Sequence, residues 1–333
     1  GRGFPPKAGE PHAEVFALRD AAERSVGATA YVTLEPCSHQ GRTPPCADAL
    51  IAAGVSRVVV AMEDPNPQVS GRGIQRIREA GIAVEVGLLE EEATQLNRPF
   101  LCWITHKRPL ITLKAAASLD GKIATHTNES QWITGPDARR LVHRHRDRHD
   151  VVMVGIGTVL ADEPQLTCRV PRGRDPIRLV VDSKLSIPEE AALFTSSETA
   201  PLWIAVADGR YDTEKAAQLM QRYGERAPAL EIIVCRSTCR GRVDLQDLMW
   251  KLGEREITSL FSESGGRLTY GMLASGLADR LMLFLAPKLI GGRDAPGILD
   301  GLGVTRLSEA PVLKNMTLSP VGEDVVIEAD FGG

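Results

Sequence analysis

The sequence lacks long apolar runs, an excess of charge of one sign and a dense set of cysteines. No run approaches the roughly 18 to 20 apolar residues that span a bilayer, and the first residues show no signal-peptide pattern. We therefore expect a cytoplasmic protein with no membrane partner. The net charge of −4 gives no general attraction to nucleic acid, so no nucleic-acid partner is expected and a few placed residues must hold any anionic substrate.

The six cysteines in 333 residues are too few and too scattered for a disulfide framework. Reduced thiols or metal ligands are the better interpretation. Three residues separate Cys235 from Cys239 in VCRSTCR, but no second pair lies nearby to complete a structural zinc site. Cys37 and Cys46 instead belong to a stretch that also contains a histidine and a glutamate.

The length of the chain suits two domains of ordinary size. Expected strands alternate with helical stretches, which is the order that forms a parallel sheet covered by helices. The pattern restarts at 107–109 and ends in an antiparallel hairpin about Pro320. The expected strands lie at 28–34, 56–62, 82–86, 110–117, 151–154, 177–181, 202–206, 231–234, 257–262, 280–286, 314–319 and 324–330. We expect an α/β protein with domains at residues 1–107 and 108–333.

One histidine, one glutamate and two cysteines in the first domain have the properties of a catalytic zinc site. His12 and Glu14 open a helical stretch, Cys37 follows a predicted strand, and Cys46 stands at the start of the next helix. A catalytic zinc takes three protein ligands and keeps one position for water. Zinc nucleobase deaminases carry H-x-E followed by P-C-x-x-C, and their glutamate moves protons. His12, Cys37 and Cys46 are thus the expected ligands of one Zn²⁺, and Glu14 is the expected general acid/base.

The spacing of the two cysteines departs from that signature, because Cys46 lies nine positions after Cys37. Two other functions stay open on these residues. One is a nucleoside or transfer-RNA deaminase with an unrelated appended domain, which the long cysteine step and the lack of a basic signature disfavour. The other is a non-catalytic, zinc-stabilised binding module, for which His39 is the only nearby fourth ligand.

Two strand–glycine–helix junctions in the second domain suit a cofactor that carries a pyrophosphate. Gly155 and Gly157 follow a buried strand and are expected to form a tight turn before a helix that begins at Thr158. Gly265 and Gly266 stand at a second junction of the same kind. The third glycine and the downstream acid of a dinucleotide fingerprint are absent, so a Rossmann domain is not predicted.

Longer motifs in both halves resemble the bifunctional riboflavin-biosynthesis deaminase/reductase family. They are GEPHAE, VTLEPCSHQGRTPPC and AMEDPNPQVSGRG in the first half, and LKAAASLDGKIA, ESQWITG, GIGTVLADEPQLTCR, VVDSKL, SESGGRL and LAPKLIGG in the second. The resemblance covers essentially the whole chain. It implies zinc-dependent deamination of a diaminopyrimidinone ribosylamine phosphate, followed by NADPH-dependent reduction of the ribose to ribityl. It also implies a cytidine-deaminase-like α/β/α domain and a dihydrofolate-reductase-like α/β domain, and we expect a homo-oligomer.

The resemblance assigns roles to further residues. His39 and Arg42 would face the pyrimidine or the phosphate in the deaminase half. Lys114, Asp162 and Glu263 would assist ribose ring opening and proton delivery in the reductase half. The residues implied for NADPH are Ala116, Trp132, Thr158, Asp162, Ser183, Gly265 and Gly266. Those implied for the substrate are Ser130, Arg146, Leu166, Arg169 and Glu263, among which the two guanidinium groups suit phosphate.

One departure from the family concerns the start of the sequence. Relatives normally have a helix and two strands ahead of the histidine, including a P-N-P segment that helps to hold the substrate base, and this stretch is absent. The sequence also starts at Gly1, without an initiator methionine. We therefore expect a sequence that begins after the natural N-terminus. The zinc ligands are untouched by this departure, and the alternative hypothesis is a reductase with an incomplete, inactive deaminase domain.

Overall fold

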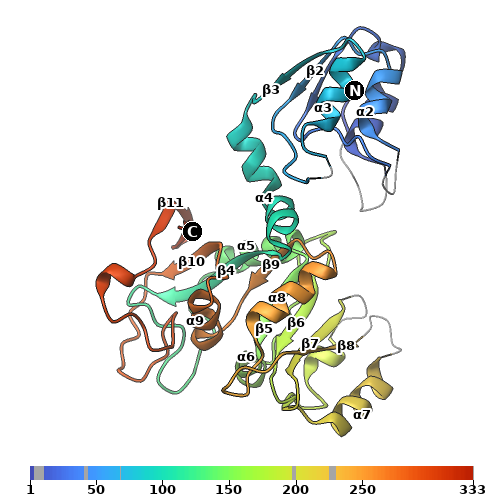
Figure 1. Ribbon diagram of the computed structural model, residues 1–333. Coiled ribbons are helices and arrows are strands. Elements are labelled where there is room, and N and C mark those ends of the chain that lie inside the picture. The colour runs from blue at the N-terminus through green and yellow to red at the C-terminus, as the bar shows by residue number, and fades with distance from the viewer. Residues whose placement is uncertain (4–10, 41–43, 68, 197–199, 225–229, 333) are drawn as a thin grey trace. The chain divides into compact units, whose positions relative to one another are not determined.

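The computed structural model describes residues 1–3, 11–40, 44–67, 69–196, 200–224 and 230–332. The chain divides into two compact units, Gly1–His106 and Lys107–Gly333, each built on its own sheet (Figure 1). This division falls one residue from the boundary that the sequence pattern predicts. Arg42 lies outside the described residues. Within the described ranges, every helix is too short or too polar to cross a membrane.

In its described residues, the first unit is a three-stranded parallel sheet with four α-helices. The strands, in their order across the sheet, are β1 (Thr29–Val32), β2 (Arg57–Val60) and β3 (Ala83–Val86). The helices are α1 (Ala13–Ala21), followed by a 3-10 turn at Ala22–Ser25, α2 (Cys46–Ala52), α3 (Arg72–Glu79) and α4 (Glu90–His106). Leu50 of α2 and Ile77 of α3 are buried against Val58 and Val60 of the central strand β2, so β2 carries the core of this unit.

The second unit is a nine-stranded mixed sheet, in the order β11-β12-β10-β4-β9-β5-β6-β7-β8. Seven neighbouring strands from β10 to β8 are parallel, and β12 pairs antiparallel with both β10 and β11. The strands are β4 (Leu110–Ser118), β5 (Val151–Gly155), β6 (Ile177–Val181), β7 (Leu202–Ala207), β8 (Leu230–Cys235), β9 (Ser259–Ser262), β10 (Arg280–Ala286), β11 (Leu313–Val321) and β12 (Asp324–Phe331). The expected C-terminal hairpin is confirmed, and its turn follows Val321, which pairs with Asp324.

Helices cover both faces of this larger sheet. They are α5 (Pro136–Arg148), α6 (Ile156–Asp162), α7 (Thr213–Tyr223), α8 (Leu245–Glu254) and α9 (Gly266–Ala274), with short 3-10 turns at Ala192–Phe194 and Leu307–Glu309. Successive side chains of β5 enter opposite cores, because alternate strand residues face opposite sides. Val152 and Val154 pack with the helices α5, α6 and α7, whereas Val151 and Met153 pack with α8 and α9. Burial on both faces explains the continuous apolar sequence of β5.

The junction after β5 differs from its sequence-based description. The helix α6 begins at Ile156 rather than at Thr158, with Gly155 as its N-cap at φ −85°. Gly157 therefore lies inside the helix and makes no tight turn. A Cβ at Gly157 would have no heavy atom within 4 Å, and the residue lines a cavity. Because Gly157 has no side chain, nothing projects from it into that cavity. A G-x-G pattern therefore occurs here in a helix that borders a cavity, although the same pattern is also typical of a tight turn.

Candidate active sites

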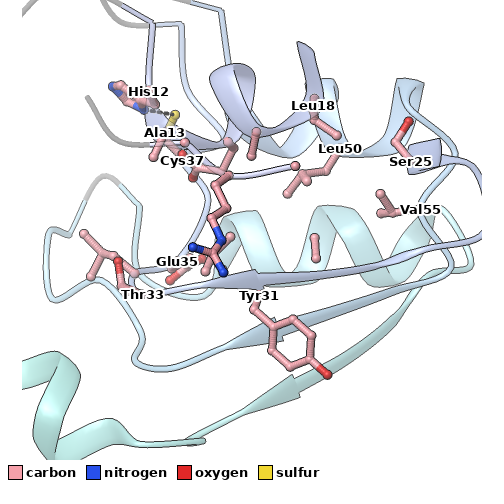
Figure 2. A pocket seen from close by; sticks show the side chains of 18 of the residues that line it. His12, Ala13, Leu18, Ser25, Tyr31, Thr33, Glu35, Cys37, Leu50 and Val55 are labelled. Carbon is pink, nitrogen blue, oxygen red and sulfur yellow. Dashed lines mark hydrogen bonds between the residues drawn. The ribbon is translucent and has the colours of Figure 1, made fainter. Parts of the chain in front are cut away.

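The three predicted zinc ligands come together at one edge of the smaller sheet. Because α1 runs back along the sheet before β1, its first turn lies near the carboxyl end of β1, where Cys37 and the start of α2 also lie. His12 Nδ1 lies 3.1 Å from Cys46 Sγ and 3.6 Å from Cys37 Sγ. All three ligand atoms lie within 4.8 Å of one another, and His12 and Cys37 face each other in Figure 2.

This donor set fits a tetrahedral zinc. Bonds of about 2.0–2.1 Å to nitrogen and about 2.3 Å to sulfur place a tetrahedral N···S pair about 3.6 Å apart. The separation of His12 Nδ1 and Cys37 Sγ has this value, and that of His12 Nδ1 and Cys46 Sγ is shorter. One imidazole and two cysteines are also the donors that zinc prefers. His39 is exposed and is not part of the described cluster. Three ligands leave a fourth position for a water, which is the pattern of a catalytic site.

The ionisation of the three side chains favours the binding of a cation, because Cys37 is a thiolate. The pKa of Cys37 is lowered to about 4, mainly by a hydrogen bond from the Cys46 thiol and also by His12. The Cys37 thiolate in turn raises the pKa of His12. It also raises the pKa of Cys46, to which burial adds. Negative charge and sulfur lone pairs thus gather at the point that the three donors share, where a metal ion would be bound.

Glu14 lies in the first turn of α1, two residues after His12, and lines the same cavity as His12 and Cys37. Burial raises the pKa of its carboxyl group. A carboxyl group with a raised pKa accepts and returns protons closer to neutral pH than an ordinary glutamate does. The arrangement therefore offers a proton carrier next to a metal site.

The cavity around this cluster has a volume of about 1250 Å³. Figure 2 shows its wall between α1 and β1, with Glu35 beneath Cys37 and Leu50 and Val55 farther along. His39, Asp64 and Asn66 also line it. The position of His39 suits the substrate contact that the sequence predicts for it.

Glu35, for which the sequence predicts no role, holds the loop that carries Cys37. Its buried carboxylate accepts hydrogen bonds from the backbone N–H groups of Asp64, Gly71, Gly73 and Ile74, at 3.3, 2.9, 2.8 and 3.2 Å. A Cβ at Gly73 would lie 1.8 Å from the carbonyl oxygen of Pro36. Glu35 and Pro36 thus fix the Cys37 loop to the start of α3. In the sequence, this role is indicated only by a glutamate two positions before a predicted metal ligand.

A second cavity, of about 1060 Å³, opens at the carboxyl ends of β5, β6 and β9. This edge of a parallel sheet is where α/β proteins bind their ligands. Five of the seven residues expected at NADPH line it, namely Thr158, Asp162, Ser183, Gly265 and Gly266. Ser130 lines it as well, and its hydroxyl donates a hydrogen bond of 2.8 Å to Asp162.

The other two residues expected at NADPH do not line this cavity. Ala116 packs against the core of the sheet. Trp132 is 63% exposed, and the guanidinium of Arg139 lies 4.6 Å from its ring centroid. Gly266 has a structural reason to be glycine, because a Cβ there would lie 2.6 Å from the carbonyl oxygen of Gly297.

Lys114, Arg146 and Glu263 form a charged group that is largely buried, with side chains 17%, 13% and 9% exposed. Arg146 donates to both carboxylate oxygens of Glu263, at 2.6 and 3.0 Å, and Lys114 Nζ lies 3.8 Å from Glu263 Oε2. Burial favours a protonated Glu263, but the charges of Arg146 and Lys114 outweigh burial and lower its pKa to about 2. Burial lowers the pKa of Lys114, against the attraction of Glu263. A lysine of lowered pKa is a better proton donor than an exposed one.

The predicted substrate residues of the second unit occupy different environments. Arg146 is committed to Glu263 and to the carbonyl oxygen of Thr167, which leaves fewer donors for a phosphate. Leu166 is buried in the core, so only its backbone is available to a ligand. Arg169 is exposed and donates to Gln165 at 2.9 Å. Glu263 lies more than a hundred positions from both Arg146 and Lys114. No local sequence pattern therefore predicts that these residues pair.

Comparisons with known proteins match both units. Residues 109–327 match the RibD C-terminal domain, and residues 3–62 match the cytidine and deoxycytidylate deaminase zinc-binding region. The riboflavin biosynthesis protein RibD of Escherichia coli is 44% identical, over 98% of this chain and 88% of its own length. The RibD of Actinobacillus pleuropneumoniae is 42% identical, over 98% and 84%.

Solved structures agree along the whole chain. The RibD structure of Acinetobacter baumannii, form 1, has a TM-score of 0.85 at 37% identity, over 99% of this chain and 88% of that one. A diaminohydroxyphosphoribosylaminopyrimidine deaminase/5-amino-6-(5-phosphoribosylamino)uracil reductase of Thermotoga maritima has a TM-score of 0.82 at 33% identity, with the same coverage.

These matches confirm the expected α/β class, with a zinc-binding deaminase domain and an NADPH-using reductase domain. The deaminase with an unrelated appended domain was a wrong alternative, because the second half matches the RibD C-terminal domain. The zinc-stabilised binding module is disfavoured for the same reason. The chain belongs to the RibD family of bifunctional riboflavin-biosynthesis deaminase/reductases.

Proposed function

We propose that this chain deaminates 2,5-diamino-6-(5-phosphoribosylamino)pyrimidin-4(3H)-one and then reduces the ribosyl side chain of the product to ribityl. Residues 1–107 would carry the first reaction and residues 108–333 the second. The observation that carries the proposal is the convergence of His12, Cys37 and Cys46 beside Glu14. The deaminase and reductase activities of the Thermotoga maritima relative support the choice of substrates.

In the deaminase, His12, Cys37 and Cys46 would hold zinc, which supplies a water of lowered pKa. Glu14 would take a proton from that water as the water oxygen bonds to the ring carbon, and would deliver the proton to the amino group, which leaves the same carbon as ammonia. His39 and Arg42 contact the ring or the phosphate. Glu35 keeps the Cys37 loop in place through its four backbone hydrogen bonds and takes no part in the chemistry.

In the reductase, NADPH supplies the hydride, which goes to the sugar carbon bonded to nitrogen. The sugar ring opens at that carbon, and Lys114 gives a proton to the ring oxygen. Glu263 holds the Lys114 ammonium group in place, and Asp162 orients Ser130. The residues that would contact the substrate are Ser130, Arg146, Leu166, Arg169 and Glu263, Leu166 through its backbone. The residues that would contact NADPH are Thr158, Asp162, Ser183, Gly265 and Gly266 in the second cavity, with Ala116 and Trp132 outside its lining.

The experiment that tests this function incubates the purified chain with the diaminopyrimidinone ribosylamine phosphate, with and without NADPH. Ammonia release and NADPH oxidation are followed separately. Both signals are expected, and ammonia release should not depend on NADPH. NADPH oxidation on predeaminated substrate without any ammonia release would favour the alternative, a reductase with an inactive deaminase domain.

We also propose that the chain forms a homo-oligomer through β11. This strand stands at the edge of the larger sheet, and Met316 and Leu318 on it are 58% and 60% exposed. Exposed edge strands with apolar side chains are surfaces that a second chain covers. Light scattering on the wild-type chain and on Leu318→Glu tests this, and a mass of one chain for the wild type would contradict it.

The free thiols and NADPH chemistry suit a reducing compartment, which supports a cytoplasmic location.

A further inference from the structure

A tight turn after β8 borders the cofactor cavity. The bridge between Ser237 and Val243 closes its base, and the N–H of Gly241 donates to the carbonyl oxygen of Thr238 at 2.9 Å. Gly241 has φ +68°, a conformation that glycine adopts without strain. Cys239 and Arg240 therefore occupy the tip of the turn. The turn residues that line the cavity are Thr238, Cys239, Arg240, Gly241 and Arg242.

Three cationic side chains line this end of the cavity, namely Lys184, Arg240 and Arg242. All three are exposed. In the part of the chain that the structure describes, none of them forms a salt bridge or donates a side-chain hydrogen bond. Arg236, at the base of the same turn, is by contrast paired with Asp244 and Asp247. The three cations therefore keep their donors available to a ligand.

The carboxylates that line this end of the cavity are already engaged. Asp182 is buried and accepts hydrogen bonds from the Ile187 N–H at 2.8 Å and the Ser186 hydroxyl at 3.0 Å. Asp244 caps α8 and accepts from the N–H groups of Gln246 and Asp247. Within the residues that the structure describes, neither acid forms an ion pair with the three cations, so their donors remain available to an anion that enters here.

Ser183 adds a neutral donor at the same place. Its hydroxyl oxygen accepts a hydrogen bond of 3.0 Å from the N–H of Val243, which joins the end of β6 to the turn. The hydroxyl proton is then free to be donated to an oxygen of a ligand. Ser183 and Lys184 thus face the same part of the cavity as the two arginines.

The position of this group in the sheet points to one part of a nicotinamide cofactor. β6 is the neighbour of β5, and the cavity extends from the end of β5 to the end of β6. In dinucleotide sites of α/β sheets, an acid near the end of a neighbouring strand binds the ribose 2′-hydroxyl of NAD, whereas a basic residue accommodates the 2′-phosphate of NADP. Here the acid in that place, Asp182, is buried and occupied, and Ser183 and Lys184 follow it.

We propose that Ser183, Lys184, Arg240 and Arg242 bind the 2′-phosphate of NADPH and set the preference for NADPH over NADH. This inference rests on the proposed reductase function and extends it to Lys184, Arg240 and Arg242, which are outside the residues that the resemblance implied. Guanidinium groups bind phosphate oxygens in pairs. The turn therefore recognises the one group that distinguishes the two cofactors, and it takes no part in hydride transfer.

The test uses the full chain and the double variant Arg240→Gln/Arg242→Gln. With predeaminated substrate, kcat/KM for NADPH is expected to fall about 30- to 100-fold, mostly through KM, while kcat/KM for NADH changes less than about threefold. Arg236→Gln is the matched control, because Arg236 belongs to the same turn but is paired; its ratio of the two values should stay that of the wild type. An equal fall with both cofactors, or no fall, would overturn the proposal.

A second measurement needs neither a variant nor reductase activity. Titration calorimetry compares adenosine 2′,5′-bisphosphate with adenosine 5′-monophosphate on the wild-type chain, and the exposed Cys239 reports occupancy through its rate of alkylation. The bisphosphate is expected to bind at least about tenfold more tightly and to slow alkylation of Cys239. Equal binding of the two nucleotides, or binding of neither, contradicts the 2′-phosphate site. Selective binding by a chain that does not oxidise NADPH would instead leave this site standing and remove the proposed reaction.

Discussion

His12 Nδ1 lies 3.1 Å from Cys46 Sγ, although 34 positions separate the two residues in the chain. The contact joins the start of α1 to the start of α2, and Cys37 completes the group from the end of β1. Three different elements thus supply one metal site, so the deaminase depends on the packing of the whole first unit.

Removing a ligand tests the metal site directly. His12→Ala and Cys37→Ala are each expected to reduce bound zinc from about one ion per chain to a small fraction, because two remaining ligands hold zinc poorly. Ammonia release should be lost with it, whereas NADPH oxidation on predeaminated substrate continues. Metal analysis by mass spectrometry gives the zinc content. Cys102→Ala serves as the control, since Cys102 lies on α4 outside the cluster, and full zinc content in His12→Ala would refute the assignment.

Much of the metal site can be predicted from the sequence, because its residues stand at element boundaries that the sequence marks. Pro44 and Pro45 precede the helix at Cys46, and the helix at His12 opens with an acid in its first turn. Such local signals place residues at helix starts. The contribution of Glu35 could not be predicted, because its partners Gly71 and Gly73 lie 36 and 38 positions away and carry no polar side chain.

The reductase site was harder to predict for a related reason. Glu263 and Arg146 are 117 positions apart, and either residue alone is compatible with a solvated charge. Their pairing follows from the sheet order, in which β9 lies between β4 and β5, and strand order is not written in local patterns. Gly157 shows the opposite problem, because a clear glycine pattern indicated a turn where the chain forms a helix.

Glu35→Gln should loosen the Cys37 loop. The amide keeps one acceptor oxygen and places an N–H₂ group against backbone donors, so we expect the first unit to lose about 2–4 kcal/mol of unfolding free energy. Ammonia release should fall, and NADPH oxidation should not. Denaturant unfolding followed with both activity assays measures this. The control is Glu63→Gln, whose carboxylate accepts an exposed hydrogen bond from Ser70; equal effects of the two substitutions would argue against a supporting role for Glu35.

Glu263→Gln leaves the buried cations Arg146 and Lys114 without their counter-ion. Breaking a buried ion pair from one side costs about 3–5 kcal/mol, and the Lys114 ammonium loses the group that holds it. We expect the second unit to be destabilised by about that amount and NADPH oxidation to fall at least about 100-fold. Glu231→Gln breaks the more exposed pair with Arg255 and should cost below about 1 kcal/mol. Wild-type reductase rates in Glu263→Gln would exclude the proposed role.

His145 predicts a pH dependence of stability. Its ring stacks on Phe261 with the centroids 5.5 Å apart, and burial lowers its pKa from 6.5 to about 4. The unfolded chain therefore binds the proton more readily, so this group makes stability decrease as the pH falls from 6.5 towards 4. His145→Leu should show a shallower loss over that window than the wild type. Thermal unfolding at a series of pH values checks this against His126→Leu, an exposed histidine, and parallel wild-type and His145→Leu curves would refute it.

The most direct test of the central claim, two independent active sites on one chain, is the double assay of Glu14→Gln. The account predicts that ammonia release falls by about 10²–10⁴-fold, as expected for a lost general acid/base, while zinc content and NADPH oxidation on predeaminated substrate stay at wild-type levels. Glu23→Gln, an exposed position in the same unit, should retain both activities. Wild-type ammonia release from Glu14→Gln, or loss of both activities together in a folded, zinc-loaded chain, would contradict the account.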